Sequence, residues 1–378
     1  MASARALRDW ILIGGFAAAL VLPTVGELLG PSSAAGVLKE KRNPAPRPEL
    51  GLDGGRLAAF PAAYERWYAD HFGFRTALIR WHNAVVLLGF GVEPNDRVLL
   101  GKEGWIFLGE PLFLDYYRAL DPFTEEELEQ WREVLEARRD FCRERGIEYV
   151  FFLAPNKATI YPELLPDRLT RVGEKSRMDQ LMEHMRAHSD VAVLDLRPDL
   201  LKAKRQGEPL YYPLGTHWND RGAYVAYRAI LRHLEPALGP AVRPKPYTAF
   251  RVEQAEDQGD TWAAKLHLED LLHQESIRLI DDKRPNQLPV PILEFEGNHM
   301  ARVTKNDFLP DAMVFRDSFG DALVPFLAAR FHRTSFYWSR RMARPYVEFE
   351  QPDVVIQEMV ERDLAVWLPT LEIELRPL

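Results

Sequence analysis

A chain of 378 residues with 47% hydrophobic residues is long enough to bury a full core, so we expect one large domain with additions. Its net charge of −8 comes without a long Lys/Arg block, which argues against nucleic acid as a partner because a phosphate backbone requires a clustered basic face. Cys142 is the only cysteine, which excludes an intramolecular disulfide.

The N-terminus has the pattern of a signal peptide or a signal anchor. Arg5 and Arg8 precede an uncharged run from Trp10 to Val25. We predict an uncleaved single-pass anchor over residues 1–30 in the inner (cytoplasmic) membrane, with the positive end in the cytoplasm and the remaining chain in the periplasm. Cleavage is the alternative, because Ser32-Ser33-Ala34-Ala35-Gly36 supplies small residues.

A Pro/Gly-rich segment over residues 31–61 reads as a spacer, since a run such as residues 43–48 cannot form a helix or a central strand. Folded structure is expected from residue 62 to the C-terminus. Aromatic residues from Tyr64 to Phe72 recur at spacings of three and four, which predicts an aromatic helix face. Residues 101–108 are typical of a hairpin, with a turn pair before an apolar strand.

The middle of the chain alternates helix and strand patterns. Thr124 caps an acidic helix start that runs to Gly146, and residues 147–154 form an apolar strand suited to a parallel sheet. A helix near residues 174–188 leads to a second strand at residues 191–196. This βαβ pattern predicts a three-layer α/β domain with a central, mostly parallel sheet.

Ser318 is the candidate nucleophile. An apolar strand-like run stops at Asp317-Ser318, and an amphipathic run follows at once, with Pro325 confined to the first turn of the expected helix. Ser318 would therefore lie on a strand-to-helix turn, where backbone N–H groups can stabilise an oxyanion. A plain helix N-cap is the competing interpretation.

His217 lies in a loop just ahead of a helix that Asn219 or Asp220 caps, so it can reach a neighbouring site. A loop histidine is nevertheless structural or merely exposed in most cases. His184 and His188 share a helix face at metal-ligand spacing, but no Glu or Cys completes a motif. We therefore expect a solvent-facing pair and no metal.

The segment from residue 243 to residue 300 is polar and irregular, and we interpret it as an insertion or lid with solvated charges. Further strands are expected at residues 334–338 and 353–356. The acidic and histidine residues of the segment, scattered without metal-ligand spacing, are Glu253, Glu256, Asp257, Asp260, His267, Glu269, Asp270 and His273.

Three separate motifs occur in the order of one known family. They span residues 152–163 with Pro155-Asn156-Lys157, residues 216–223 with Thr216-His217-Trp218-Asn219, and residues 316–319 with Arg316-Asp317-Ser318-Phe319. The set resembles the AlgJ/AlgX-like alginate O-acetyltransferases, which have a permuted SGNH-hydrolase-like α/β fold and acetylate exopolysaccharide outside the cytoplasmic membrane. The resemblance runs from about residue 62 to the C-terminus, apart from the segment 243–300. The N-terminal anchor makes the chain look more similar to the AlgJ branch than to the AlgX branch.

The resemblance implies Ser318 as the nucleophile and His217 as its base. Asn156, Lys157 and Trp218 become candidate oxyanion or substrate contacts. The implied reaction needs no cofactor and passes through an acyl-serine to a polysaccharide acceptor. The implied acetyl source is a membrane-bound O-acyltransferase partner.

One position departs from the family pattern. The family carries an Asp two residues before the His, and this chain has Gly215 there. An orienting carboxylate fixes the imidazole tautomer, so another acid must take that place or the site is weakened. Asp317 is nearest to the nucleophile in sequence and Asp220 is nearest to the His; the sequence leaves both open.

Two rival functions stay open at this stage. A carbohydrate esterase would use the same serine chemistry with water as the acceptor. A non-catalytic polysaccharide-binding or assembly subunit would be consistent with Gly215, and the exposed-looking Trp105, Trp218 and Trp262 would serve it.

Overall fold

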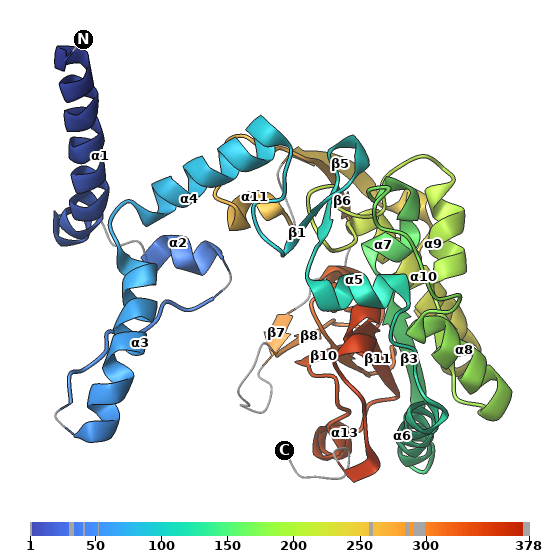
Figure 1. The fold of residues 1–378 in the computed structure, drawn as a ribbon. Coiled ribbons are helices and arrows are strands. Elements are labelled where there is room, and N and C mark those ends of the chain that lie inside the picture. The colour runs from blue at the N-terminus through green and yellow to red at the C-terminus, as the bar shows by residue number, and fades with distance from the viewer. Residues whose placement is uncertain are drawn as a thin grey trace. The chain divides into compact units, whose positions relative to one another are not determined.

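The chain forms two compact units in a computed structural model, which describes residues 2–29, 34–40, 42–51, 53–256, 260–283, 288–290 and 299–372. Residues 1–95 with 261–273 make the first unit, and residues 96–260 with 274–378 make the second. The helices between residues 62 and 95, where the sequence predicts the start of the folded domain, belong to the first unit (Figure 1). Each unit is described by itself.

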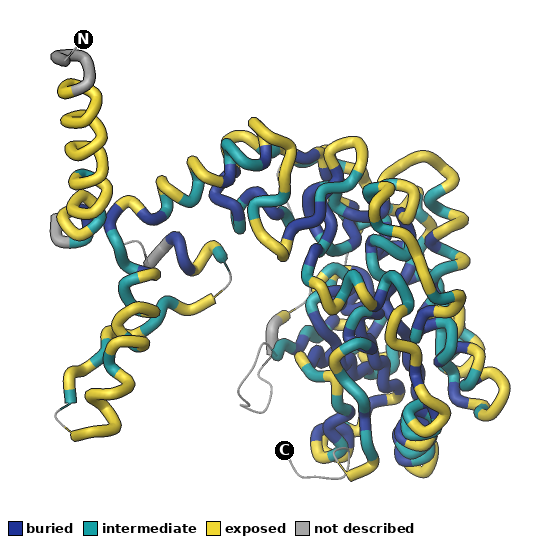
Figure 2. Tube along the Cα trace, in the orientation of Figure 1, coloured by how far each residue is buried: buried dark blue, intermediate teal, exposed yellow. Residues whose placement is uncertain are grey.

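The first unit consists of helices. From residue 6 to residue 27, α1 is long and apolar enough to cross a membrane, judged by length and composition, and only 6% of its apolar window is buried. Figure 2 shows it almost wholly in the colour of exposed residues. The possible cleavage stretch lies partly outside the described residues. The helices are α1 (Ala2–Leu29), α2 (Ala34–Lys39), α3 (Gly54–His71), α4 (Arg75–Ala84), which continues as η1 (Val85–Gly89), and α11 (Trp262–Lys265).

The expected spacer is partly helical. Residues 43–50 have no regular structure, in line with the prediction, but α3 starts at Gly54 and runs through Pro61. The reason is local: the Asp53 side chain accepts a hydrogen bond from the Arg56 amide and caps the helix eight residues before the expected start.

Charged groups tie the segment 261–273 into the first unit. Arg75 forms a two-point pair with Glu40, whose carboxylate also lies 3.3 Å from the buried His267 Nε2. Arg42 likewise donates two hydrogen bonds to the Asp70 carboxylate, from Nη2 at 2.6 Å and from Nη1 at 2.8 Å. Paired burial of this kind satisfies charges that would be costly alone, and through His267 it links the segment 261–273 to the first unit.

The second unit is built on a seven-stranded sheet in the order β4-β3-β11-β9-β10-β8-β7. The first five strands run parallel, while at one edge β8 pairs antiparallel with β10 and β7 pairs antiparallel with β8. The prediction of a central, mostly parallel sheet is confirmed. The strands are β3 (Glu148–Ala154), β4 (Val193–Asp195), β7 (Leu288–Val290), β8 (Met300–Val303), β9 (Ala312–Arg316), β10 (Arg333–Trp338) and β11 (Val354–Val360).

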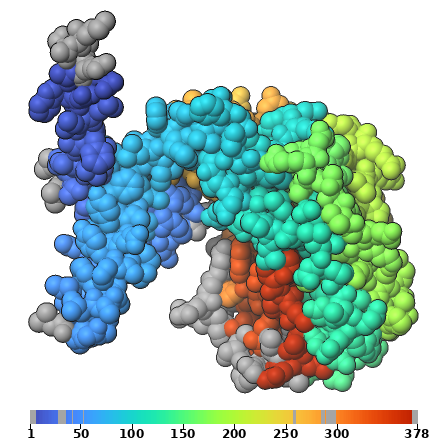
Figure 3. All heavy atoms as spheres, viewed as in Figure 1, coloured from blue at the N-terminus to red at the C-terminus, as the bar shows by residue number. Residues whose placement is uncertain are grey.

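Helices cover both faces of this sheet, which makes three layers. Successive β3 side chains point to opposite faces: Val150 and Phe152 join the core cluster under α10, whereas Phe151 and Leu153 join the cluster under α6 and α8. All four side chains are buried, as expected for a parallel strand covered on both faces. Figure 3 shows red C-terminal atoms beside turquoise atoms of residues that precede β3, both in the second unit.

The expected helices and the hairpin are present. Thr124 and Glu127 form a complete capping box at the start of α6. The hairpin joins β1 (Val98–Leu100) to β2 (Ile106–Leu108) through η2 (Lys102–Gly104). The remaining helices are α5 (Pro111–Arg118), α6 (Glu125–Arg143), α7 (Lys157–Ile160), η3 (Pro162–Leu164), α8 (Arg177–His188), α9 (Arg197–Lys204), α10 (Asp220–Leu238), η4 (Pro240–Val242), η5 (Tyr247–Ala249), η6 (Phe319–Leu323), α12 (Val324–Leu327), α13 (Arg344–Glu350) and η7 (Glu361–Ala365).

The segment 243–300 is more regular than expected, although part of it lies outside the described residues. It contains an antiparallel pair of strands, β5 (Arg251–Glu256) and β6 (Glu275–Ile280). Between these strands the chain leaves the second unit after Asp260 and returns at Gln274, whose side-chain amide donates to the Asp260 carbonyl at 3.0 Å.

Candidate active site

Ser318 lies where β9 ends and the 3-10 helix η6 begins. The helix that the sequence predicts after it is short, because η6 gives way to a single α-helical turn that ends at Leu327, with Pro325 in its first turn. The Ser318 side chain makes no cap hydrogen bond. Its hydroxyl therefore serves another partner.

That partner is His217. Ser318 Oγ lies 2.7 Å from His217 Nε2, although 101 residues separate the two in the chain. The imidazole also contacts the ring of Phe319, with centroids 4.6 Å apart. The structure thus brings the two residues of separate motifs within hydrogen-bonding distance, the geometry that a serine and its base require.

The acid that completes the arrangement is Asp260, one of the residues whose charges we expect from sequence to be solvated. Its Oδ2 lies 2.8 Å from His217 Nδ1 and also accepts hydrogen bonds from the Thr216 amide at 2.5 Å and hydroxyl at 2.8 Å. Only 8% of its side chain is exposed. An ionised carboxylate can only accept, so Nδ1 carries the imidazole proton and Nε2 is left to accept the Ser318 proton.

Gly215 makes room for this acid. A Cβ at this position would lie 2.2 Å from the Asp260 carbonyl oxygen and 3.0 Å from Oδ2. No side chain fits there while Asp260 keeps its place. The glycine at the position of the family Asp therefore leaves the space that Asp260 needs.

Neither acid favoured from sequence contacts His217 in the structure. Asp317 accepts from the backbone amides of Phe319 and Val360 at 2.8 and 2.7 Å, so it braces the turn that holds Ser318. Asp220 accepts from the Leu279 amide at 2.8 Å. Closeness in the sequence does not identify the acid that contacts His217, because backbone amides donate to the side chains of both Asp317 and Asp220.

A second carboxyl lies beneath the Ser318 turn. Glu358 is 1% exposed, and its Oε2 accepts from the Asp317 amide at 2.9 Å. Burial, together with the neighbouring Asp317 charge, raises the pKa of Glu358 well above its usual value, and burial also raises the pKa of Asp317. The pair therefore holds a proton at pH values at which isolated carboxyls would have lost it.

Donors for an oxyanion differ in part from those expected. The Phe319 amide is taken by Asp317, and the Asn156 amide donates to Glu361 at 2.7 Å. Within the described part of the chain, the amide of Ser318 and the side-chain amide of Asn156 donate to no protein acceptor. Both amide groups can therefore donate to a negative charge on a bound substrate.

Backbone carbonyls accept hydrogen bonds from the side chains of both Lys157 and Trp218. The Lys157 ammonium is enclosed by backbone carbonyls. Trp218 is 1% exposed and donates its indole N–H to the Phe319 carbonyl at 3.0 Å. Trp105 and Trp262 are buried as well, at 8% and 2% exposed, so none of the three tryptophans offers the exposed face that a binding subunit would use.

A cleft of about 410 Å³ opens at Ser318. This volume lies within the range of about 300–1,000 Å³ that is usual for small-molecule sites. The cleft is lined by Arg316, Asp317, Ser318, Trp338, Ser339, Arg340, Arg341, Val360, Arg362, Asp363 and Trp367. Four arginines face two aspartates there, so the lining carries excess positive charge.

Arg316 illustrates how this charge is held. Its side chain is wholly buried, and Nη1 pairs with Asp321 at 2.7 Å while Nε and Nη2 find no partner within the described part of the chain. Gly320 allows this position, because a Cβ there would lie 2.7 Å from the Arg316 side chain.

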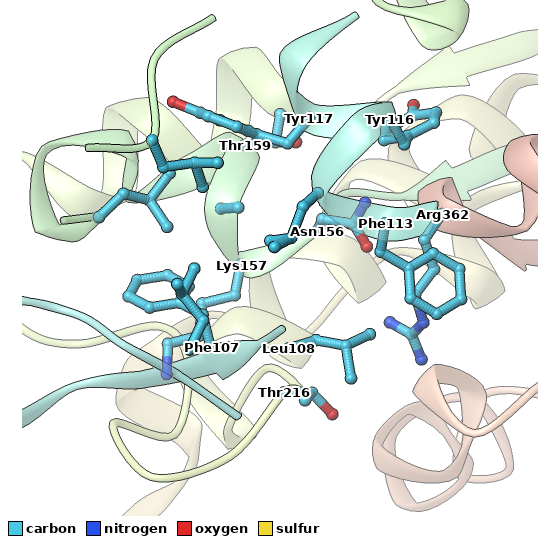
Figure 4. Close-up of a pocket in the computed structure, with 15 residues that line it drawn as sticks. Phe107, Leu108, Phe113, Tyr116, Tyr117, Asn156, Lys157, Thr159, Thr216 and Arg362 are labelled. Atoms are coloured by element: carbon cyan, nitrogen blue, oxygen red, sulfur yellow. The ribbon is translucent and has the colours of Figure 1, made fainter. Parts of the chain in front are cut away.

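A smaller pocket of about 50 Å³ lies beside the Asn156 loop (Figure 4). Asn156, Lys157, Thr216 and Arg362 line it together with the rings of Phe107 and Phe113, so residues of two of the three motifs share one pocket wall. Arg362 lines this pocket and the Ser318 cleft alike.

His184 and His188 do not form a metal site. Their rings lie 4.6 Å apart, but only His188 is exposed, while His184 is mostly buried with Nε2 3.5 Å from Glu129. The expectation of a solvent-facing pair is wrong for His184. Within the described part of the chain, no group of three or more His, Cys, Asp or Glu residues could hold a metal ion.

The sequence offered one indirect signal for Asp260. The glycine in place of the family acid indicated that an acid must come from elsewhere, and the irregular segment after residue 243 holds many. Nothing local distinguishes Asp260 from its acidic neighbours, because its role depends on a contact 43 residues away in the chain.

Comparisons with known proteins show which proteins the chain is similar to. Residues 98–275 match the SGNH hydrolase-like domain of acetyltransferase AlgX, a range that includes His217 and Asp260. The chain is 30% identical over 134 residues to the "Probable alginate O-acetylase AlgJ" of Pseudomonas aeruginosa, which covers 35% of this chain and 31% of that protein. A protein of the same name from Pseudomonas syringae pv. tomato is 24% identical over 168 residues, 44% of this chain and 41% of that protein.

The chain therefore aligns with well under half the length of these curated relatives. The fold is also similar to that of Bacillus cereus PatB1, with a TM-score of 0.54 at 16% identity over 73% of this chain and 100% of that one. The parallel sheet and these matches show an SGNH hydrolase-like fold, and in sequence the chain is similar to the AlgJ/AlgX-like proteins.

Proposed function

We propose that this protein is a serine-dependent O-acetyltransferase that moves acetyl groups onto hydroxyls of a cell-surface or secreted polysaccharide. The observation that carries the proposal is the continuous contact from Asp260 through His217 to Ser318, with distances of 2.8 and 2.7 Å. The names of the family and of the curated relatives support acetyl transfer to a polysaccharide as the reaction class.

In the first half-reaction His217 Nε2 takes the Ser318 proton as Oγ attacks the acetyl carbonyl of the donor. The negative charge that forms on the carbonyl oxygen would be met by the Ser318 amide and the Asn156 side chain. The leaving group departs with the proton from His217, and an acetyl ester of Ser318 remains. Asp260 stabilises the transient imidazolium and keeps it in the productive orientation.

In the second half-reaction a sugar hydroxyl enters the Ser318 cleft. His217 removes its proton, the sugar oxygen attacks the acetyl-serine, and Ser318 regains a proton as the ester bond to the enzyme breaks. The arginine-rich lining of the cleft supports an acceptor that carries negative charge. An acidic polysaccharide supplies both the sugar hydroxyl and the negative charge.

The proposal also concerns location and donor. Helix α1 has the length and composition of a membrane anchor, and the positive residues before it favour a catalytic domain outside the cytoplasm, in the periplasm. An acetyl source at the membrane is then required, and a membrane-bound O-acyltransferase is the donor that the family resemblance implies.

Transfer from an activated acetyl ester to an acidic oligosaccharide, followed by mass spectrometry, tests the reaction. We expect the wild-type chain and a Ser339→Ala control to acetylate the oligosaccharide, and Ser318→Ala to fail. Ser339 is a suitable control because it lines the same cleft but bonds the Arg341 carbonyl. Transfer by Ser318→Ala would contradict the proposal, and acetate release without acetylated sugar would indicate an esterase.

A further inference from the structure

Lys157 is a buried cation directly behind the candidate active site. It follows Asn156 at the carboxyl end of β3 and is the first residue of α7. The residue is 4% exposed, and its side chain runs past the ring of Phe107 (Figure 4). An isolated buried ammonium would be costly, so its surroundings must compensate for the lost water.

Four backbone carbonyls surround the ammonium. Nζ lies 2.9 Å from the Ile106 oxygen, 2.8 Å from that of Tyr212, 2.7 Å from that of Pro213 and 3.0 Å from that of Gly215. Carbonyl oxygens only accept hydrogen bonds, and a charged ammonium offers three donors where a neutral amine offers two. The cage therefore matches the protonated side chain.

Aromatic rings and one carboxylate favour the same charge state. The ammonium lies 4.5 Å from the ring centroid of Trp105 and 4.7 Å from that of Phe107. Burial lowers the pKa of Lys157 well below its usual value, and the Asp260 carboxylate opposes this effect.

The caged carbonyls belong to the loop that presents His217. Tyr212, Pro213 and Gly215 immediately precede Thr216 and His217, and three of the four contacts go to them. Other ties to this loop are the Asp260 carboxylate on Thr216 and His217, and backbone bonds such as the Tyr212 amide to the His217 carbonyl at 3.1 Å. Lys157 is thus a charged centre on which one side of the loop converges.

We propose that Lys157 is a positioning residue, whose ammonium fixes the loop 212–217 so that His217 keeps its contacts with Asp260 and Ser318. The proposal rests on the proposed acyl transfer and replaces the earlier interpretation of Lys157 as a substrate contact. A positioning role predicts that loss of the charge lowers kcat and leaves KM for the acceptor almost unchanged.

The test compares Lys157→Met with wild type in the full chain, by steady-state kinetics of acetyl transfer and by proton NMR of the His217 Nδ1–H. We expect kcat to fall on the order of 10- to 100-fold, since small displacements of catalytic groups cost this much. KM should stay within about twofold, and the NMR signal of the Nδ1–H bonded to Asp260 should shift or disappear.

Lys204→Met is the matched control. Lys204 also donates to a backbone carbonyl, that of Ile160 at 2.6 Å, and lies 4.5 Å from the ring centroid of Tyr161, and neither contact involves the loop 212–217. We expect this variant to match wild type in both measurements. If Lys157→Met does not fold, Lys157→Gln decides by the same criteria, because its amide keeps two donors without the charge.

Wild-type kcat with an unmoved Nδ1–H signal in the Lys157 variant would overturn the proposal, as would a loss confined to KM. The NMR measurement needs no turnover. An inactive wild-type protein would therefore count against the proposed function, while the signal in the variant would still test the positioning role.

Discussion

Replacing Asp260 tests the least expected element of the site. In Asp260→Asn the amide oxygen can take the place of Oδ2 and accept the same three hydrogen bonds, from the Thr216 amide and hydroxyl and from His217 Nδ1. The geometry then survives while the negative charge is lost. Because the same change of orienting acid in a serine protease costs about 10⁴ in kcat, we expect a loss of about 10³- to 10⁴-fold here.

Asp260→Ala separates the structural part of the effect. It removes the acceptor of the Thr216 amide and of His217 Nδ1, and one unpaired buried donor costs about 1–3 kcal/mol. The free energy of unfolding should fall by about this amount in Asp260→Ala and much less in Asp260→Asn. Chemical denaturation measures this difference.

Acetyl-transfer kinetics provide the assay, with Asp220→Asn as the control. Asp220 is the acid nearest to His217 in sequence, yet it accepts from the Leu279 amide. We expect its replacement to lower kcat by less than about tenfold. An Asp260→Asn variant within tenfold of wild type, with a large loss in Asp220→Asn, would refute the assignment of the acid.

Three further predictions concern Gly215, Glu358 and Arg362. Gly215→Ala should lower the free energy of unfolding by about 1–3 kcal/mol and reduce kcat, because its Cβ would lie 2.2 Å from the Asp260 carbonyl oxygen; a thermal melt and a rate measurement that both match wild type would contradict this. Burial raises the pKa of Glu358 in the folded state, so the folded protein holds more protons than the unfolded chain and the free energy of unfolding should fall as pH rises above the usual range of a glutamate; Glu358→Gln should flatten this dependence in denaturation curves, and an unchanged slope would speak against it. Arg362→Met should raise KM for an acidic oligosaccharide by about 5- to 10-fold and leave KM for a neutral one nearly unchanged, because Arg362 lines the cleft at Ser318; equal effects on both acceptors would show that its charge is not used.

Local patterns in the sequence predict much of the scaffold. The capping box at Thr124 and the buried strand from residue 148 to residue 154 depend on neighbouring residues alone, and both are present in the structure. The turn at Ser318 is also local, since an apolar strand must end before the hydroxyl can lie at the sheet edge. The helix after it is shorter than the periodicity suggests.

Long-range contacts in the site are not readable in this way. The partnership of His217 with Asp260 depends on a carboxylate that the chain brings back from a segment without a recognisable motif. Trp218, which the sequence suggests is exposed, is buried because its indole N–H donates to the Phe319 carbonyl, a contact across 101 residues. The sequence also does not reveal the partners of Lys157, because the carbonyls that enclose it come from β2 and from the loop before His217.

The central claim is that Ser318 carries the acetyl group between donor and acceptor. The most direct test incubates the full chain with an activated acetyl ester in the absence of a sugar acceptor, and measures its intact mass and a peptide map. We expect one acetyl adduct located on Ser318, absent from Ser318→Ala and discharged when an acidic oligosaccharide is added. A wild-type protein without an adduct, or an equal adduct on Ser318→Ala, would contradict it.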